Sequence, residues 1–257
     1  MICGLLHPGS GLGNMLFRYI TTRILALDKG FEFSMINPEG FKGKSFMNLD
    51  FGVKNNIPYH VEMPSGKIIQ DDGWNKLPLW EEKTSYYNPE INYVEDNTII
   101  DGNFEDGRYF EHRMSEVGEW LKITHQYIPE NLCIIGFRGG EYKTIPELWL
   151  PKSYWDEARH LMIQKYPGIR FEVHTDDPKT AREFFPIYPI IHDVEQNWRA
   201  VRYARYSIIA NSSFYVLPRL LKHHQDNAFT IAPKYWNRYN TKEWKFPQNY
   251  YRQFTQI

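Results

Sequence analysis

"YPIIHDVEQNWRAVRYARYSIIANSSFYVLPRLL", residues 188–221, sets the architecture of the second half of this chain. Two short apolar runs, 188–192 and 206–210, alternate with two segments whose apolar residues recur at helical spacing. Strands that alternate with helices predict βαβ units, whose strands lie parallel in one sheet with right-handed crossovers. The strands are apolar through their middles, which indicates a sheet covered on both faces.

The same alternation extends through the rest of the second half and, less regularly, into the first half. Further strands are predicted at 132–138, 170–175 and 228–232, and helices at 153–165, 178–185, 196–205 and 213–222. In the first half we expect strands at 1–6 and 31–36 and a strand with a turn over 97–104. We also expect a helix from Leu12, a second helix over about 110–121, and loops with short elements between 37 and 97. We therefore predict an α/β fold with a doubly wound parallel sheet, divided into domains 1–128 and 129–257.

Composition narrows the class of protein. The chain has 257 residues, a formal net charge of −1 and no long run of Lys and Arg, so nothing indicates a nucleic-acid partner. Cys3 and Cys133 lie in apolar runs, so we expect both to be buried as small hydrophobic residues and not to form a disulfide framework. Free cysteines are typical of proteins from a reducing compartment. There is no signal-peptide pattern and no apolar run near the ~20 residues of a membrane helix. We expect a cytoplasmic protein without a transmembrane segment, and the sequence leaves the oligomeric state open.

Polar side chains follow three of the predicted strands where ligands of parallel sheets bind, beyond their carboxyl ends. The three groups are Arg138; Asp176 and Asp177; and Asn211, Ser212 and Ser213. Arginine carries a fork of donors suited to phosphate, and the serines lie where a helix begins and free N–H groups bind anions. Taken singly, each residue also fits a helix cap or a structural ion pair. Their common placement predicts a nucleotide-diphosphate site.

The glycine-rich stretch "HPGSGLGNML", residues 7–16, precedes the first helix. Its spacing fits neither the G-x-G-x-x-G dinucleotide fingerprint nor a P-loop, because Asn14 stands where the third glycine would be and no Gly-Lys-Ser/Thr follows. By spacing alone it is either a structural turn into a helix or a loop that approaches a ligand.

The segment "GLGNMLFRY", residues 11–19, resembles the N-terminal "GLGNQLFQY" motif of the α-1,2-fucosyltransferases of glycosyltransferase family eleven. Five more segments are similar to that family's motifs in the same order: "IDGNFEDGRYF" (100–110), "GFRGGEY" (136–142), "HTDDP" (174–178), "IIANSSFYVLPRLL" (208–221) and "APKYW" (232–236). The resemblance spans nearly the whole chain.

This resemblance implies a GT-B-like fold of two Rossmann-like domains. The nucleotide-sugar site would lie in the doubly wound parallel sheet of the C-terminal domain, and the N-terminal domain would bind the acceptor. Its implied reaction transfers L-fucose from GDP-fucose, with inversion, to a hydroxyl of a glycan acceptor, with galactose the expected sugar. The partners are then a nucleotide sugar and a glycan, with no metal and no cofactor beyond the donor substrate.

The resemblance also implies roles for individual residues. Arg138 would contact the diphosphate and neutralise charge on the departing GDP. The other donor-binding positions it implies are Gly11, Gly13, Asn14, Asp176, Asp177, Ser212 and Ser213. Independently of the resemblance, Glu141 is the first candidate for a general base because it follows the end of the Arg138 strand, and Asp101 or Glu105 are the alternatives. Pairing of Glu141 with a nearby cation, or a reaction that uses no protein base, are the other interpretations.

The chain departs from the family at positions that bear on the donor. Gly136 stands where a histidine contacts guanine in related enzymes, and Gly139 replaces a second arginine near the phosphates. Val216 and Leu217 replace two tryptophans, and Met15 replaces a glutamine. Two alternatives therefore stay open: a glycosyltransferase of the same fold with another nucleotide-sugar donor, and a non-catalytic protein that binds glycans or nucleotides.

Overall fold

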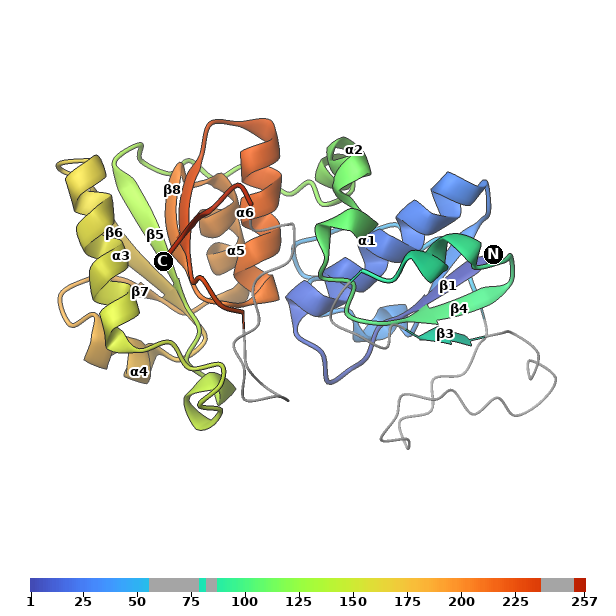
Figure 1. Cartoon of the computed structure of the whole chain (residues 1–257), viewed down its shortest axis with the longest axis horizontal. Coiled ribbons are helices and arrows are strands. Elements are labelled where there is room, and N and C mark those ends of the chain that lie inside the picture. Colours follow the sequence, from blue (N-terminus) through green and yellow to red (C-terminus); the bar gives the residue numbers. More distant parts are fainter. Residues whose placement is uncertain (56–78, 82–86, 237–251) are drawn as a thin grey trace. The chain divides into compact units, whose positions relative to one another are not determined.

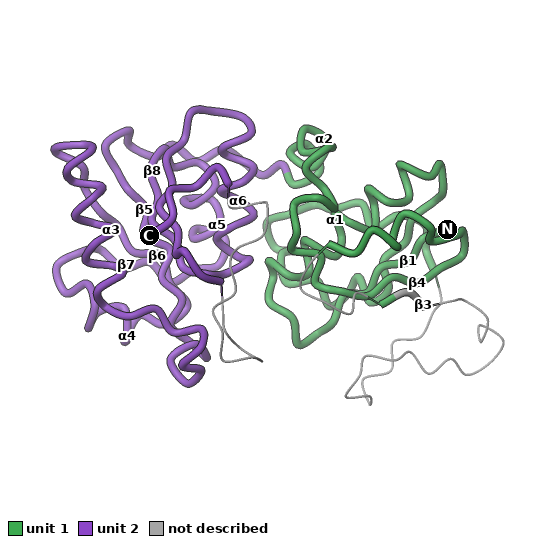
Figure 2. Tube along the Cα trace, viewed as in Figure 1, with its two compact units in different colours: residues 1–121 green, residues 122–257 purple. Residues whose placement is uncertain are grey.

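A computed structural model describes residues 1–55, 79–81, 87–236 and 252–257 of the chain (Figure 1). The chain divides into two compact units, Met1–Leu121 and Lys122–Ile257, here called unit 1 and unit 2 (Figure 2). Each unit contains a parallel sheet of its own. The roles assigned to segments 1–128 and 129–257 stay predictions.

Unit 2 is built on a six-stranded sheet in the order β7-β6-β5-β8-β9-β10, with every pairing parallel. The chain runs outward from β5 through β6 to β7, then returns to β8 on the other side of β5. This is the strand order of the doubly wound dinucleotide-binding fold, and its direction reverses between β5 and β8. The predicted doubly wound sheet is confirmed. Its strands are β5 (Leu132–Phe137), β6 (Arg170–Thr175), β7 (Ile190–Ile191), β8 (Tyr206–Ile209), β9 (Phe229–Ala232) and β10 (Thr255–Gln256).

Helices cover both faces of this sheet, with α3 on one side and α5 and α6 on the other (Figure 1). They are α3 (Lys152–Lys165), α4 (Pro178–Phe184), α5 (Val194–Tyr203) and α6 (Ser213–Gln225), with the 3₁₀ turn η5 at Glu141–Thr144. Capping side chains determine where α4 and α5 begin. The side chains of Asp177 and Asp193 accept hydrogen bonds from N–H groups in the first turns of α4 and α5, respectively. The core between the layers contains large buried rings, among them Phe137 and Trp155 with centroids 5.3 Å apart.

Unit 1 is a four-stranded parallel sheet in the order β2-β1-β4-β3. Its strands are β1 (Ile2–Leu5), β2 (Phe33–Ile36), β3 (Leu79–Glu81) and β4 (Thr98–Asp101), and its helices are α1 (Leu12–Lys29) and α2 (Met114–Trp120). Short 3₁₀ turns lie at η1 (Pro38–Gly40), η2 (Pro89–Tyr93), η3 (Gly107–Tyr109) and η4 (Glu111–Arg113). Helix α1 ends at Gly30, whose φ of 69° is the left-handed conformation that glycine adopts at low cost.

One predicted helix of unit 1 is wrong in its first part. Instead of a helix over 110–121, the chain forms η3, η4 and the short α2. Asp106 accepts a hydrogen bond from the Arg108 N–H and starts a 3₁₀ turn. Phe110, with φ −144°, then leaves the helical conformation and is fully buried, its ring 5.4 Å from that of Phe17. Burial of the Phe110 side chain therefore outweighs the helical spacing of the apolar residues that follow it in the sequence.

Candidate functional site

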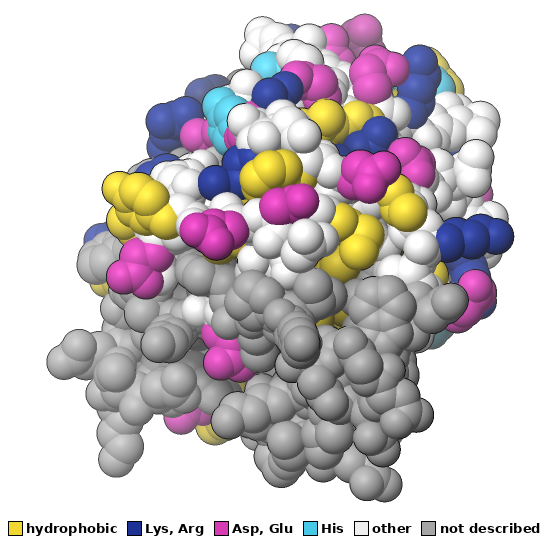
Figure 3. Space-filling model, turned by 90° about the vertical axis from the view of Figure 1, so that its right-hand side faces the viewer, with side chains coloured by type: hydrophobic (Ala, Val, Ile, Leu, Met, Phe, Trp, Pro, Cys, Tyr) yellow, Lys and Arg dark blue, Asp and Glu magenta, His cyan; other side chains and the backbone are white. Residues whose placement is uncertain are grey.

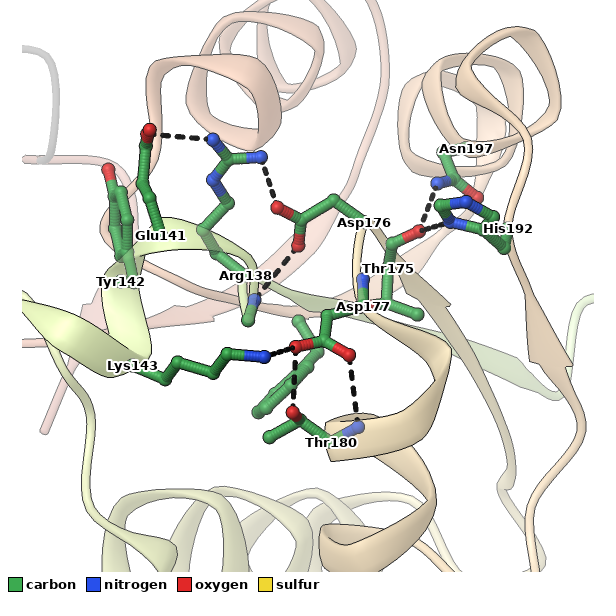
Figure 4. Close-up of polar contacts among 12 residues, drawn as sticks. Arg138, Glu141, Tyr142, Lys143, Thr175, Asp176, Asp177, Thr180, His192 and Asn197 are labelled. Carbon is green, nitrogen blue, oxygen red and sulfur yellow. Dashed lines mark hydrogen bonds and ion pairs between the residues drawn. The ribbon is translucent and has the colours of Figure 1, made fainter.

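Three loops meet at the carboxyl edge of the unit 2 sheet, around the point where its strand order reverses. They follow β5, β6 and β8 and contain the residues that the sequence marks out, of which Figure 4 labels those in the β5 and β6 loops. The β5 loop carries Arg138, Glu141, Tyr142 and Lys143, and the β6 loop carries Asp176 and Asp177. The β8 loop carries Asn211, Ser212 and Ser213 at the start of α6.

Arg138 links the β5 and β6 loops. Its guanidinium donates through Nη1 to Asp176 and through Nη2 to Glu141 Oε1 at 3.0 Å, and the N–H of Gly139 donates to the other oxygen of Asp176 at 2.9 Å (Figure 4). The guanidinium carbon also lies 5.3 Å from the centroid of the Tyr142 ring. Burial lowers the pKa of Arg138, but Asp176 and the neighbouring tyrosines raise it by more, so the side chain stays a cation. With 27% of that side chain exposed, the cation can reach a ligand.

Asp177 is occupied by structural contacts. One carboxylate oxygen accepts from the Thr180 N–H at 3.1 Å, and the other accepts from the Thr180 hydroxyl and from Lys143 Nζ, each at 2.7 Å. The hydrogen bond from Lys143, ahead of those from Thr180, lowers the pKa of Asp177 to about 2 despite partial burial. The carboxylate therefore caps α4 and anchors the β5 loop, as the structural interpretation of this residue expects. Its role beside a nucleotide base stays a prediction.

Two of the departures from the fucosyltransferase motifs have a steric reason. A Cβ atom at Gly136 would lie 2.7 Å from a ring carbon of Tyr215, whose hydroxyl is 3.0 Å from the carbonyl oxygens of Phe137 and His174. A Cβ atom at Gly139 would lie 2.6 Å from the Cβ of Asp177. Neither the motif histidine nor the second motif arginine fits this backbone without movement of its neighbours.

The start of α6 brings buried polar side chains to this edge of the sheet. Ser212 is the N-cap residue, but its side chain makes no capping hydrogen bond and the first turn contains no acidic residue. Asn211 beside it is 3% exposed and donates through Nδ2 to the carbonyl oxygens of Leu148 and Trp236, at 3.2 and 2.7 Å. Within the described part of the chain, the Oδ1 atom of Asn211 is buried and accepts no hydrogen bond. A buried acceptor of this kind calls for a donor from a ligand or a water.

The glycine-rich stretch lies in unit 1, where it forms the turn after β1 and the first residues of α1. Gly11 is the N-cap of α1 with φ −69° and ψ 159°, a conformation open to any residue, and a Cβ atom there would meet nothing within 4 Å. Gly13 is buried in the first turn of α1, and Asn14 follows on the same helix. Neither backbone conformation nor packing therefore requires a glycine at position 11. Approach of Gly11, Gly13 and Asn14 to a donor stays a prediction.

Among the alternative bases, Asp101 is the last residue of β4 in unit 1, and Glu105 follows a few positions later. The structure places Glu141 in unit 2, on η5 and against Arg138, which is the pairing that the sequence offered as its structural interpretation. Sequence reasoning missed Tyr142 and Lys143 as members of this edge. Their position directly after Arg138, in the same strand-end loop, was the available signal.

Metal ligands and membrane spans were sought across the described residues. In that part of the chain no three His, Cys, Asp or Glu side chains are grouped so as to hold a metal ion. No helix there is long and apolar enough to cross a membrane. On the face drawn in Figure 3, acidic and basic side chains of the described residues are interspersed, so they form no basic patch there.

Comparison with solved structures supports the fold. The chain is similar to Escherichia coli heptosyltransferase WaaC with ADP, with a TM-score of 0.51 and 11% sequence identity over 100% of this chain and 93% of that chain. The chain has the α/β GT-B fold of glycosyltransferases, with Rossmann-like units. No protein-family model matches the sequence, and neither does any curated protein sequence. The likeness concerns the fold and does not extend to the fucosyltransferase family that the motifs resemble.

Proposed function

We propose that this protein is an inverting glycosyltransferase that binds a nucleotide-diphosphate sugar at the carboxyl edge of the unit 2 sheet. The observation that carries the proposal is the position of Arg138 directly after β5 and of the start of α6 after β8, because the strand order reverses between these two strands. Doubly wound sheets bind their ligands at this point. A cation and a helix N-terminus are both suited to a diphosphate.

Each part of a nucleotide sugar has a matching group at this edge. The first-turn N–H groups of α6 and the hydroxyls of Ser212 and Ser213 would donate to phosphate oxygens. Asn211 Oδ1 would accept from a hydroxyl of the ribose or of the transferred sugar, which would supply the donor that this buried oxygen lacks within the described residues. Arg138 would stabilise the negative charge that the leaving diphosphate gains as its bond to the anomeric carbon breaks.

The carboxylates around Arg138 compete with the ligand. In the structure Arg138 is shared between Asp176 and Glu141, so a diphosphate must displace one of these contacts or share the guanidinium with it. Glu141 is the easier to displace, because its side chain is exposed and it makes a single contact with Arg138. Asp176 is also tied to the Gly139 N–H and is better placed to remain and accept from a ligand hydroxyl.

For the donor we propose GDP-fucose, with a glycan hydroxyl, expected on galactose, as the acceptor. The six ordered motif resemblances support this assignment. A second donor is favoured by one observation: Tyr215 fills the space beside Gly136 where the motif histidine would stand. Since the similar heptosyltransferase structure contains ADP, an adenine nucleotide is the alternative to be tested first.

A nucleotide panel tests the proposal. Thermal unfolding of the wild-type protein would be followed with GDP, UDP, ADP and CMP, because a ligand that binds the folded state at 100 times its Kd adds about 2.7 kcal/mol of stability. We expect the largest shift with a nucleoside diphosphate, and no shift for Arg138→Ala. Arg170→Ala is the matched control, since Arg170 begins β6 and so lies at the opposite edge of the same sheet.

Three outcomes separate the candidates. A preference for GDP supports GDP-fucose, whereas a preference for another diphosphate supports the second donor. Diphosphate binding without any sugar transfer or donor hydrolysis would support the non-catalytic alternative. No response to any nucleotide, or an equal response in Arg138→Ala, would overturn the proposed site.

A further inference from the structure

A small hollow lies within unit 1, between one face of α1 and the turns η2, η3 and η4 (Figure 2). Helix α1 contributes Thr21, Ile24, Leu25 and Asp28 to its lining. These four residues are spaced at i, i+3, i+4 and i+7, so they share one face of the helix. The volume of the hollow is about 30 Å³, which is room for about two water molecules or two hydroxyl groups of a larger ligand.

Thr21 brings an unpaired hydroxyl to the lining of this hollow. The residue is 2% exposed, and within the described part of the chain its Oγ1 atom makes no hydrogen bond. A threonine in a helix commonly directs this hydroxyl to the carbonyl oxygen four residues back, as Thr22 does toward Arg18 at 2.7 Å. Because a buried hydroxyl without a partner is destabilising, Thr21 calls for a hydrogen bond from a ligand or a water in the hollow.

The other side of the hollow is held in place by a buried carboxylate. Arg108 donates through Nε and Nη2 to the two oxygens of Asp106, at 2.9 and 2.7 Å, and Asp106 is fully buried. The guanidinium carbon of Arg108 lies 4.9 Å from the centroid of the Tyr87 ring, which lies 4.8 Å from that of Tyr109. Asn92 Nδ2 donates to the Tyr87 hydroxyl at 2.9 Å. These contacts fix the aromatic lining before a ligand arrives, which lowers the entropic cost of binding.

The charged groups around the hollow balance one another. Asp28 accepts from His112 Nε2 at 2.8 Å and from Arg113 Nε at 2.6 Å, while Asp106 pairs with Arg108. The charges of these two carboxylates and two guanidiniums sum to zero. A phosphate or a metal ion would therefore meet no excess of opposite charge. Hydrogen-bonding groups of both kinds, set beside aromatic rings, suit an uncharged ligand that carries hydroxyls.

We propose that this hollow binds one unit of a neutral saccharide, with a sugar hydroxyl on Thr21 Oγ1 and the apolar face of the sugar ring on Tyr87. A hydroxyl both donates and accepts, so it supplies the partner that Thr21 lacks among the described residues. The site is separate from the carboxyl edge of the unit 1 sheet. Thr21 lies nine residues beyond Leu12, the first residue of α1, and therefore about 14 Å along the helix axis. The proposal does not depend on the transfer reaction in which unit 2 would take part.

NMR spectra of the full chain with labelled isoleucine methyl groups test the site, because Ile24 and Ile91 both line the hollow. The neutral probes are galactose, glucose and mannose. Galacturonate and galactosamine carry one charge each on the galactose ring. We expect a neutral sugar to shift the Ile24 and Ile91 signals in a saturable manner and to leave that of Ile208, buried on β8 of unit 2, unchanged. The two charged sugars should bind more weakly than galactose.

Two neighbouring threonines give a matched pair of variants. Thr21→Val removes the unpaired hydroxyl, so the Kd for the sugar should rise about three- to tenfold, as for the loss of one hydrogen bond. The Tm of this variant without sugar should stay the same or rise, because the hydroxyl has no partner to lose among the described residues. Thr22→Val removes the bond to the Arg18 carbonyl and should lower the Tm while it leaves the Kd unchanged.

Each remaining outcome contradicts the proposal. No saturable shift at Ile24 and Ile91 with any neutral sugar, or an unchanged Kd in Thr21→Val, would overturn it. Tighter binding of galacturonate or galactosamine than of galactose would also overturn it. If Thr21→Val lowers the Tm as much as Thr22→Val does, the Thr21 hydroxyl is bonded in the protein without sugar and the hollow holds water only. Nucleotide binding is measured separately, so failure of the proposed function leaves these results unaffected.

Discussion

The packing of Tyr215 against Gly136 gives the sharpest stability prediction. Gly136→Ala adds one methyl group at a position where a Cβ would lie 2.7 Å from the Tyr215 ring, about 0.7 Å inside the closest ordinary contact of roughly 3.4 Å. The ring cannot move freely, because it is 2% exposed and its hydroxyl lies 3.0 Å from two backbone carbonyls. Overpacking of this kind costs about 1–3 kcal/mol.

A double-mutant cycle isolates this contact. Tyr215→Ala alone should destabilise by about 3–5 kcal/mol, as for other large buried aromatic side chains. In that background the added methyl group meets no ring, so Gly136→Ala should be neutral or stabilise by about 0.4–1 kcal/mol through the entropy of the unfolded chain. The coupling energy between the two positions should therefore be about 1–4 kcal/mol.

The assay is urea unfolding of the four proteins, followed by circular dichroism, with slopes compared to check that the transition stays two-state. Gly168→Ala would be a poor control, since Gly168 has φ 83°, whereas Gly9→Ala is suitable because a Cβ there meets nothing within 4 Å. Gly136→Ala that costs nothing beside the intact Tyr215 ring would refute the steric reason given for the missing motif histidine.

Further predictions follow from the charged groups of unit 2. Glu141→Gln removes one competitor for Arg138 and should tighten binding of a nucleoside diphosphate about two- to fivefold, measured by calorimetry, as expected for an exposed ion pair; weaker binding would contradict the competition. Asp177→Ala should weaken the cap of α4 by about 1 kcal/mol at pH 7, measured by thermal unfolding. The pKa of Asp177 is lowered to about 2 in the folded protein, so its carboxylate stabilises the fold at pH values above its pKa in the unfolded chain, near 3.9. This contribution is lost as the pH falls toward 2. An acid-unfolding profile that is unchanged in Asp177→Asn would contradict this prediction. Burial lowers the pKa of His223 to about 4, so the unfolded chain takes up a proton at a higher pH than the folded protein does. Stability should therefore fall as the pH drops from about 6.5 to 4. His223→Gln should flatten that decline in thermal unfolding, and an equally steep decline in the variant would contradict this prediction.

The sequence predicts unit 2 well because its strands and helices carry local signals. Apolar runs ended by Arg138, Asp176 or Asn211 mark the strand ends, and Asp177 and Asp193 cap the helices that follow. Once the strands are parallel, their carboxyl ends must share one edge, so the meeting of Arg138 with Asp176 follows from topology. The two-residue β10 carries no such signal, since its place at the sheet edge depends on pairing with β9.

The parts that sequence reasoning missed depend on contacts between distant segments. The cluster of His7, Arg18 and Asp101 joins β1, α1 and β4, and nothing near His7 in the sequence reveals its carboxylate partner. The broken helix at Phe110 has the same cause, because the burial of its ring beside Phe17 overrides local spacing. Of the stretch between 37 and 97 that was expected to form loops and short elements, residues 56–78 and 82–86 lie outside the described residues, and the described part contains η1, β3 and η2.

The most direct test of the account is a crystal structure of the protein with the nucleoside diphosphate that stabilises it best. The account predicts diphosphate oxygens within hydrogen-bond distance of Arg138 and of the first-turn N–H groups of α6, and a ligand hydroxyl on Asn211 Oδ1. A nucleotide bound elsewhere on the chain, with the Arg138 guanidinium still shared between Asp176 and Glu141 and touching no phosphate, would contradict it.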